Sequence, residues 1–254
     1  MRRLGRRNVA AGLAAMAAAP AWSRRARAQN ASVEVDLELV LAVDVSRSVD
    51  DQEFELQRRG YARAFTHPTV IRAIQANPLR KIAVAFVEWS GAEFQKTVVP
   101  WTEIADAESG ALFADRVLEA PRSFWGWTSI SGAIDHSVGM FGQAYRGRRK
   151  VIDVSGDGIN NSGRPAYAAR DDAVARGVAI NGLVIMNDNP NPGPRGFAQP
   201  PLDEFYREQV IGGPGAFVIA IDEFESFAYA IVNKLIKEIA DFAVDPSVRV
   251  AEAK

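Results

Sequence analysis

Three oxygen-bearing side chains follow an apolar run near the start of the chain: Asp44, Ser46 and Ser48. The residues just before them, 39–43, are all apolar, which is typical of a strand buried on both faces in a parallel sheet. Open α/β sheets bind their ligands beyond the carboxyl ends of such strands. A carboxylate and two hydroxyls there are donors that hard cations such as Mg²⁺ prefer. A turn followed by a helix cap uses the same residue types, so the short pattern alone leaves both interpretations open.

These side chains need a framework, and the rest of the chain alternates apolar runs with stretches of helical spacing. The alternation predicts an α/β fold with a Rossmann-like, open, mostly parallel six-stranded sheet, one antiparallel edge strand and helices on both faces. The expected strands are 39–44, 81–89, 94–99, 150–155, 178–185 and 217–221, and the expected helices are 50–64, 69–75, 101–118, 129–145, 164–176, 202–210 and 223–242.

Candidate caps mark the beginnings of two of these helices. Thr102 is the candidate N-cap of the helix 101–118, because a hydroxyl there can accept from the first free backbone N–H groups. Ser46 and Ser48 are alternative caps for the helix that begins at Asp50, and a serine could serve both as a cap and as a metal ligand.

Two more oxygen donors are expected at the edge of the sheet that carries Asp44. Thr128 precedes the helix that starts at Ser129, and Asp157 follows the next strand along the chain. Parallel strands end at the same edge of a sheet, so the helix between them lets Thr128 and Asp157 reach that edge together. We therefore expect Thr128 and Asp157 to lie near Asp44.

Order and spacing of these residues resemble a known family. Segments 44–48 (DVSRS), 126–129 (GWTS) and 155–158 (SGDG) together resemble the metal-ion-dependent adhesion site of von Willebrand factor A (vWA) domains. The resemblance extends over about residues 35–242 and is strongest to an exported bacterial branch of this superfamily whose function is uncharacterised. This chain departs from the family pattern in two places: Gly156 stands between Ser155 and the aspartate, and the bulky Trp125 and Trp127 lie around the threonine.

The resemblance implies roles for the five residues. Ser46, Ser48 and Thr128 would bind Mg²⁺ directly through their hydroxyls, and Asp44 and Asp157 would hold it largely through water. Neutral hydroxyl ligands leave the cation with much of its positive charge, and Mg²⁺ readily keeps open or water-filled positions. An Asp or Glu of a protein partner could then complete the coordination. Mn²⁺, which also prefers oxygen ligands, could replace Mg²⁺.

Two functions use the same site. The first is a metal-dependent protein-binding module and not an enzyme. The alternative is a Mg²⁺-dependent hydrolase or phosphatase in which the ion orients a phosphate. No phosphate-binding glycine loop stands at a strand–helix junction, and no Ser-His-Asp order with a nucleophile elbow occurs, so the binding module is preferred. A solute-binding protein ranks last because two lobes are not evident.

Several residues near the pattern have two interpretations. Trp125 and Trp127 flank the loop that carries Thr128, and they could form a binding rim or pack into the protein. Asp153 shares a strand face with Asp157 and could support the site, although a structural hydrogen bond is favoured. The two histidines, His67 and His136, are isolated in sequence and are not expected to be metal ligands.

Charge divides the chain into an amino-terminal stretch and an acidic body. Residues 1–29 hold seven of the 30 basic residues and no acidic residue, which leaves 23 basic against 31 acidic residues in the remainder, a net charge of −8. So acidic a body argues against nucleic-acid binding. The chain has no cysteine, which excludes disulfides and thiolate chemistry.

The amino-terminal stretch reads as an export signal of the twin-arginine type. Arg6-Arg7 precedes a mild apolar segment, and Ala26-Arg27-Ala28 offers a small-x-small cleavage pattern. An arginine-rich tail without a signalling role is the alternative. We therefore expect a signal over 1–29, a periplasmic or secreted vWA-like domain over 30–245 with no stable membrane span after removal of the signal, and a frayed tail over 246–254.

Overall fold

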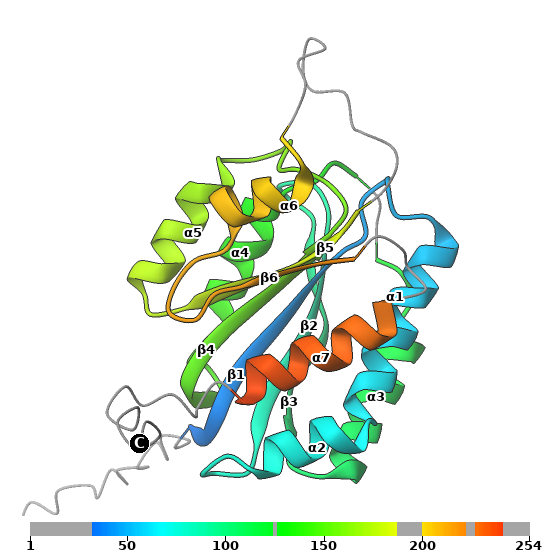
Figure 1. Ribbon diagram of the computed structural model, residues 1–254, viewed down its shortest axis with the longest axis vertical. Coiled ribbons are helices and arrows are strands. Elements are labelled where there is room, and N and C mark those ends of the chain that lie inside the picture. Colours follow the sequence, from blue (N-terminus) through cyan, green and yellow to red (C-terminus); the bar gives the residue numbers. More distant parts are fainter. Residues whose placement is uncertain (1–31, 124–125, 187–199, 222–226, 241–254) are drawn as a thin grey trace, which may run out of the picture. The chain divides into compact units, whose positions relative to one another are not determined.

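Six strands form a single open sheet in the computed structural model, which describes residues 32–123, 126–186, 200–221 and 227–240 (Figure 1). The strands are arranged in the order β3-β2-β1-β4-β5-β6, so β1 and β4 are neighbours at the centre. Their bounds are β1 (Val33–Asp44), β2 (Ile82–Trp89), β3 (Gln95–Ile104), β4 (Tyr145–Gly156), β5 (Ala179–Ile185) and β6 (Val218–Ile221).

Strand pairing confirms the predicted fold class. β1 runs parallel to both β2 and β4, β5 runs parallel to β4 and β6, and the edge strand β3 is antiparallel to β2. The last pairs of the central strands align Asp44 with Trp89, and Val43 with Ser155. Because the parallel strands end in register, the loops after β1, β2 and β4 leave the sheet at one edge.

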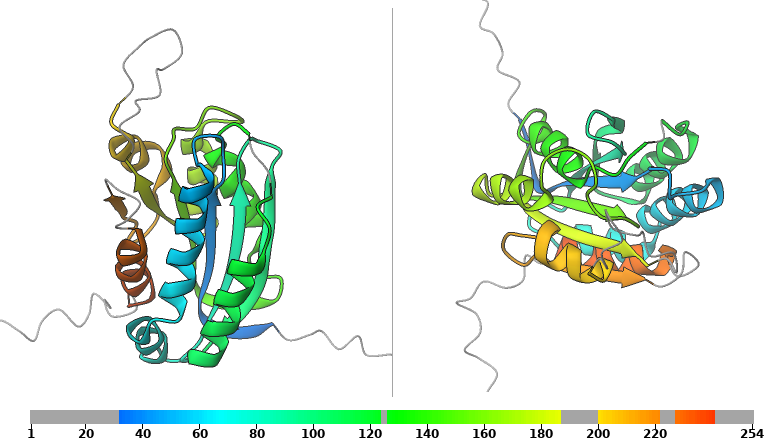
Figure 2. Two further views of the ribbon diagram at one scale, coloured as in Figure 1. Left: turned by 90° about the vertical axis from the view of Figure 1, so that its right-hand side faces the viewer. Right: turned by 90° about the horizontal axis from the view of Figure 1, so that it is seen from above.

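Helices cover both faces of the sheet, and two apolar layers lie between them and the strands (Figures 1 and 2). One layer joins the sheet to α1, α2, α3 and α7, and the other joins it to α4, α5 and the π-helical turn η2. The helices are α1 (Asp51–Phe65), α2 (Pro68–Gln75), α3 (Ala107–Glu119), α4 (Ile130–Met140), α5 (Ala166–Ala175), α6 (Leu202–Phe205), η2 (Tyr206–Val210) and α7 (Phe227–Ala240).

Strand β1 begins at Val33, six residues before the predicted start at residue 39, and two further boundaries differ from the sequence prediction. Thr102 is not a helix cap, because it lies inside β3, which continues to Ile104 alongside β2. The helix begins later, at Ala107. The Asp106 side chain accepts from Ser109 N, and the Ser109 hydroxyl oxygen accepts from Asp106 N. A capping box of this kind satisfies two backbone donors at once and fixes the helix start.

The second of these differences concerns β4, which begins at Tyr145, whereas the sequence predicts a helix up to residue 145. α4 ends at Met140, Gly142 adopts a φ of +73°, and Val33 pairs with Tyr145. A glycine with positive φ commonly ends a helix. The alternating charged residues that follow are paired to β1, so tertiary pairing overrides their weak strand propensity.

The predicted export signal over 1–29 and the tail over 246–254 fall outside the described residues. Within the described ranges, none of the helices has the length and apolar character needed to cross a bilayer.

Candidate metal centre

Asp44 ends β1, and the loop after it folds back on this carboxylate. The Ser46 backbone N–H donates to Asp44 Oδ1 at 2.7 Å, and the hydroxyls of Ser46 and Ser48 are 3.2 Å apart. The first turn of α1 does not use either serine as its cap. Asp50 is the cap, and it forms a capping box with Glu53. The interpretation of Ser46 and Ser48 as caps is therefore wrong, which leaves their hydroxyls directed at the edge of the sheet.

Thr128 and Asp157 meet these serines from two other loops. Ser48 Oγ donates to Asp157 Oδ1 at 2.7 Å, and Thr128 Oγ1 lies 3.4 Å from Ser46 Oγ. All five side chains, from three separate loops, are thus gathered at the carboxyl edge of β1 and β4. Asp44, Ser46, Thr128 and Asp157 are buried, whereas Ser48 is exposed to solvent.

The oxygen spacings suit a small cation. Octahedral Mg²⁺ at about 2.1 Å from each ligand places neighbouring ligand oxygens about 3 Å apart, and the spacings observed here are 2.7, 3.2 and 3.4 Å. The donor set consists of two carboxylates and three hydroxyls. Among the described residues, at this site or elsewhere, no three His, Cys, Asp or Glu side chains gather in a way that could hold a metal ion, so the candidate site depends on its hydroxyls.

Asp44 supplies a second indication that a cation fits here. Its Oδ2 is buried, and no donor in the described part of the chain lies within hydrogen-bond distance. Burial raises the pKa of Asp44 well above its ordinary value, and the nearby charge of Asp157 raises it further, while the N–H of Ser46 opposes both effects. A nearby positive charge would favour the anionic form of this buried carboxylate, and a cation bound at the unused oxygen would supply one.

Gly156 is required by close packing at this point. A Cβ built on Gly156 would lie 2.8 Å from Tyr206 Oη and 3.0 Å from Asp44 Oδ2, closer than ordinary contacts allow. The glycine therefore lets β4 pass between Tyr206 and Asp44. The departure from the family pattern does not displace Asp157, whose carboxylate still reaches Ser48.

Asn161 contributes to the site from a stretch, 160–163, for which the sequence predicts only a loop. Its side-chain Oδ1 accepts from Thr128 N at 2.8 Å, and its own N–H donates to Thr128 O at 2.9 Å. The loop after β4, which carries Asp157, is thereby joined to the loop that carries Thr128. Asn side chains commonly accept from backbone N–H groups in loops, and this tendency is the one feature of the sequence that could have indicated a structural role for Asn161.

Arg122 joins the loop before Thr128 to the loop after β1. Its guanidinium donates to Val45 O at 3.2 Å and to Val49 O at 2.7 Å, on either side of the two serines. It also pairs with Asp51 at 3.0 Å. Because Arg122 lies far from these partners in sequence, no local pattern could have revealed this contact.

A buried ion pair holds the start of the loop that leads to Thr128. Arg58 of α1 and Glu88 of β2 are 2.5 Å apart with both side chains inaccessible. Glu88 Oε2 accepts from Ser123 N at 3.1 Å, and Arg58 donates to the carbonyl oxygens of Val117 and Ala120. The end of α3 and the start of the loop are consequently fixed to β2.

Asp153 belongs to a second cluster of charges, which lies further from the carboxyl edge of the sheet than Asp44 and Asp157. We call the charges around Asp153 the lower cluster and those around Asp44 the upper cluster. Lys234 of α7 lies 2.6 Å from Asp153 and also pairs with Glu238, and all three side chains are buried. Asn181 of β5 donates to Glu238 at 2.9 Å. Burial, followed by the charge of Glu238, raises the pKa of Asp153 to about 7, while Lys234 opposes the rise. Asp153 therefore attaches β4 to α7, the structural role favoured from sequence.

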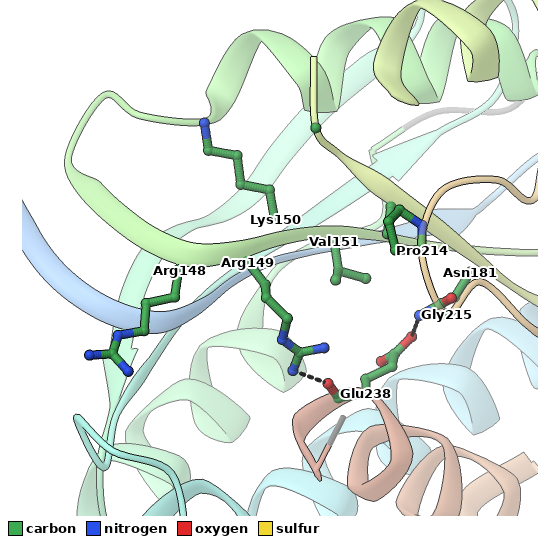
Figure 3. A pocket seen from close by; sticks show the side chains of 10 residues that line it. Arg148, Arg149, Lys150, Val151, Asn181, Pro214, Gly215 and Glu238 are labelled. Carbon is green, nitrogen blue, oxygen red and sulfur yellow. Dashed lines mark hydrogen bonds between the residues drawn. The ribbon is translucent and has the colours of Figure 1, made fainter. Parts of the chain in front are cut away.

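A pocket of about 470 Å³ borders this cluster toward the start of β4 (Figure 3). Figure 3 shows Arg149 reaching the end of α7, where it donates to Glu238 O at 2.5 Å. Arg148 and Lys150 also line the pocket, but their side chains point away from Glu238. The three basic side chains do not converge, so the pocket lacks the arrangement expected of an anion site.

The remaining candidates occupy different positions. His67 caps α2 by accepting from Thr69 N, and His136 lies 3.2 Å from Thr97 Oγ1. Trp127 is 70% exposed beside Thr128, whereas Trp125 falls outside the described residues.

Comparison with known families and structures gives a match along nearly the whole domain. A family model described as "Protein of unknown function (DUF1194)" matches residues 34–243. Among curated proteins, none matches the sequence.

Solved structures share the fold at low identity. Proximal thread matrix protein 1 (PTMP1) from the mussel byssus, with a zinc-occupied MIDAS motif, is 19% identical, with a TM-score of 0.58 over 82% of this chain and 49% of that chain. A von Willebrand factor type A protein from Catenulispora acidiphila is 16% identical, with a TM-score of 0.55 over 82% and 42%. The pilus adhesin SpaC from Lactobacillus rhamnosus GG is 14% identical, with a TM-score of 0.60 over 82% and 30%.

These likenesses show a vWA-like fold. The chain spans less than half the length of each of the three structures that it resembles.

Proposed function

The chain belongs to the DUF1194 family, and we propose that it is a metal-dependent protein-binding module of the vWA type that recognises a carboxylate of its partner. The observation that carries the proposal is the buried, unpartnered Oδ2 of Asp44, whose carboxylate is joined to Ser46, while the Ser46 hydroxyl lies near those of Ser48 and Thr128. Ser46, Ser48 and Thr128 would hold a divalent cation, with Asp44 and Asp157 beside them. Mg²⁺ suits these oxygen donors, and Mn²⁺ could replace it.

The donor set favours binding of an outside anion. Three of the five donors are neutral hydroxyls, so the cation keeps more positive charge than it would among carboxylates. Such a cation, when bound, attracts a further carboxylate at an open position. Ser48 is the exposed member of the set, so an Asp or Glu of a partner would approach from its side.

Two of the fold relatives are consistent with this role. The mussel protein carries a metal-occupied MIDAS motif, and the Lactobacillus protein is an adhesin. A binding role is also favoured over catalysis because the two histidines in the described ranges are engaged elsewhere, at Thr69 and at Thr97. Neither is placed to act as a base beside Asp44.

Calorimetry of Mg²⁺ and Mn²⁺ binding to the chain lacking residues 1–29 tests the proposal. We expect saturable binding that is lost in Asp44→Ala and in the double variant Ser46→Ala/Ser48→Ala. Asp115→Ala, which removes an exposed carboxylate from α3, is the matched control and should bind as the wild type does.

Two results would contradict the proposal. Absence of metal binding, both alone and with a short Asp-containing peptide present, would remove the metal site. Phosphatase turnover that depends on Mg²⁺ and is lost in Asp44→Ala would replace the binding module with a hydrolase that uses the same residues.

We also propose that residues 1–29 direct export, so that a single domain over 30–245 acts in the periplasm or outside the cell. The basic, acid-free composition of this stretch and its Arg6-Arg7 pair support the proposal. Amino-terminal sequencing of the protein recovered from the periplasm should begin near Gln29 or Asn30. Recovery of the uncleaved chain from the cytoplasm alone would overturn it.

A further inference from the structure

Two aromatic side chains stand at the surface beside the proposed metal site. Trp127, the residue before Thr128, is 70% exposed, and Phe94 in the β2–β3 turn is 48% exposed. Both lie against Gly91: a Cβ built there would be 3.3 Å from Phe94 Cδ2 and 3.8 Å from Trp127 Cβ. The two rings therefore rise from adjoining loops, next to one of the proposed ligands.

The loops that carry these rings are held by backbone hydrogen bonds. Ser129 N donates to Ser90 O at 2.7 Å, which joins the Trp127 loop to the β2–β3 turn. Within that turn, Ser90 N donates to Phe94 O at 2.9 Å and Phe94 N donates to Gly91 O at 3.0 Å. An aromatic side chain on a fixed backbone loses little conformational entropy when a partner covers it.

Arg47 adds a positive charge to the same surface. It lies between Ser46 and Ser48, its side chain is exposed, and its backbone N–H donates to Gly126 O at 3.2 Å. Trp and Arg are the residue types that most often dominate the energetics of protein interfaces. A cationic metal and an arginine together would draw an acidic group, and the aromatic rings beside them would contact what adjoins that group.

We propose that three side chains, here called the rim, select a polypeptide segment in which an Asp or Glu adjoins a large apolar side chain. The rim consists of Arg47, Phe94 and Trp127. The inference rests on the proposed function, because the carboxylate must first be held at the metal. Successive side chains of an extended peptide stand only a few ångströms apart. Because successive side chains also alternate between the two faces of the peptide, a side chain one or two residues from an acid bound beside Thr128 is within reach of Trp127.

Peptide binding in the presence of Mg²⁺ tests the inference. The probes are five blocked pentapeptides. One has a central Asp with glycine at the other four positions, and each of the other four has a single Phe in place of one of those glycines. We expect at least one Phe peptide to bind about tenfold more tightly than the glycine peptide, in line with a buried aromatic contact. Trp127→Ala should abolish the difference and leave Mg²⁺-dependent binding of the glycine peptide unchanged.

Matched variants separate the rim from a general effect of exposed apolar groups. Leu112→Ala, which removes a side chain 53% exposed on α3, should keep the tenfold preference. Trp127→Phe should retain part of it.

Each remaining outcome overturns a stated claim. Equal binding of all five peptides to the wild type, still dependent on Mg²⁺, would overturn the rim and leave the proposed function intact. A preference that survives both Trp127→Ala and Phe94→Ala would also overturn the rim. No Mg²⁺-dependent binding of any peptide would overturn the proposed function and the rim together.

Discussion

Two clusters of buried carboxylates lie along the central strands, and they differ in where their positive charge comes from. In the lower cluster, Asp153 and Glu238 surround Lys234, a cation that the chain itself provides. In the upper cluster, Asp44 and Asp157 are accompanied by hydroxyl groups, and Asp44 Oδ2 has no donor among the described residues.

The difference indicates what each cluster does. A carboxylate that is neutralised by a fixed lysine fastens one element to another, here β4 to α7. Under the proposed function, the upper cluster takes its cation from solution, so it would be sensitive to that cation, and the bound metal ion could in turn bind a further ligand. Breaking a buried ion pair leaves an uncompensated charge, so the lower cluster is expected to contribute mainly to stability, whereas the upper cluster is expected to respond to an added cation.

The largest expected effect follows from removal of the internal cation. Lys234→Met leaves two buried carboxylates without a counter-charge and should lower the free energy of unfolding by about 3–5 kcal/mol. Urea denaturation measures the change. Lys237→Met, on the exposed side of the same helix, should cost no more than about 1 kcal/mol. Equal stability of Lys234→Met and wild type would show that the lower cluster does not hold α7.

The next effect concerns the external cation. If the upper cluster binds Mg²⁺ only when folded, a concentration of one hundred times the dissociation constant should raise the free energy of unfolding by about 2.7 kcal/mol. Thermal unfolding with and without Mg²⁺ measures the shift. Lys234→Met should respond to Mg²⁺ like the wild type, because its missing charge belongs to the lower cluster. If the Mg²⁺ response disappeared in Lys234→Met, the two clusters would be energetically coupled and not independent.

A smaller effect of opposite sign is expected for Asp44→Asn in the absence of metal. The substitution removes a desolvated charge next to Asp157 while keeping the oxygen that accepts from Ser46 N. It should stabilise the metal-free protein by about 1–2 kcal/mol and abolish the stabilisation by Mg²⁺. Chemical denaturation in EDTA and in Mg²⁺ tests both signs. Destabilisation in EDTA would mean that the Asp44 charge is already compensated within the chain.

Counted per pH unit, the smallest effect is a dependence on pH at the lower cluster. The pKa of Asp153 is raised to about 7 in the folded state from an ordinary value of 3.8, so the folded protein holds this proton more tightly than the unfolded chain. Its contribution to stability is present below about pH 4 and is lost as the pH rises toward 7, by at most about 1.4 kcal/mol per pH unit. Asp153→Asn should flatten that slope when unfolding is followed in Mg²⁺ between pH 5 and 7. An unchanged slope would assign it to other groups.

Most of the fold could be predicted from the sequence because its signals are local. The apolar runs of β1, β2 and β5 and the turn residues between them define strands directly, and their alternation with helices implies a parallel sheet. The strand–loop positions of Asp44, Thr128 and Asp157 followed from the same reasoning. Boundaries failed where a long-range partner decided them, as in β3, which extends to Ile104 because β2 pairs with it.

The supporting contacts could not be predicted, because nothing in the local sequence marks them. Lys234 lies in a helix where lysine is usually exposed, and only the fold brings Asp153 beneath it. Arg122 likewise reads as a surface residue until the loop folds over Val45 and Val49. Burial of a charge is a tertiary property, so the sequence shows the donors of the upper cluster but not what holds them in place.

The position of the upper cluster in the sheet has a mechanical consequence. β1 begins and α7 ends at the opposite end of the domain from Asp44, since Leu37 pairs with Arg149, which also reaches the carbonyl groups of Glu238 and Ile239 (Figure 1). If a partner binds at the Asp44 edge as proposed, a pulling force between that edge and the opposite end of the domain acts along β1. A force in that direction loads the hydrogen bonds of β1 to β2 and β4 together, in shear, instead of opening them one by one. The sheet is therefore expected to resist tension applied along β1.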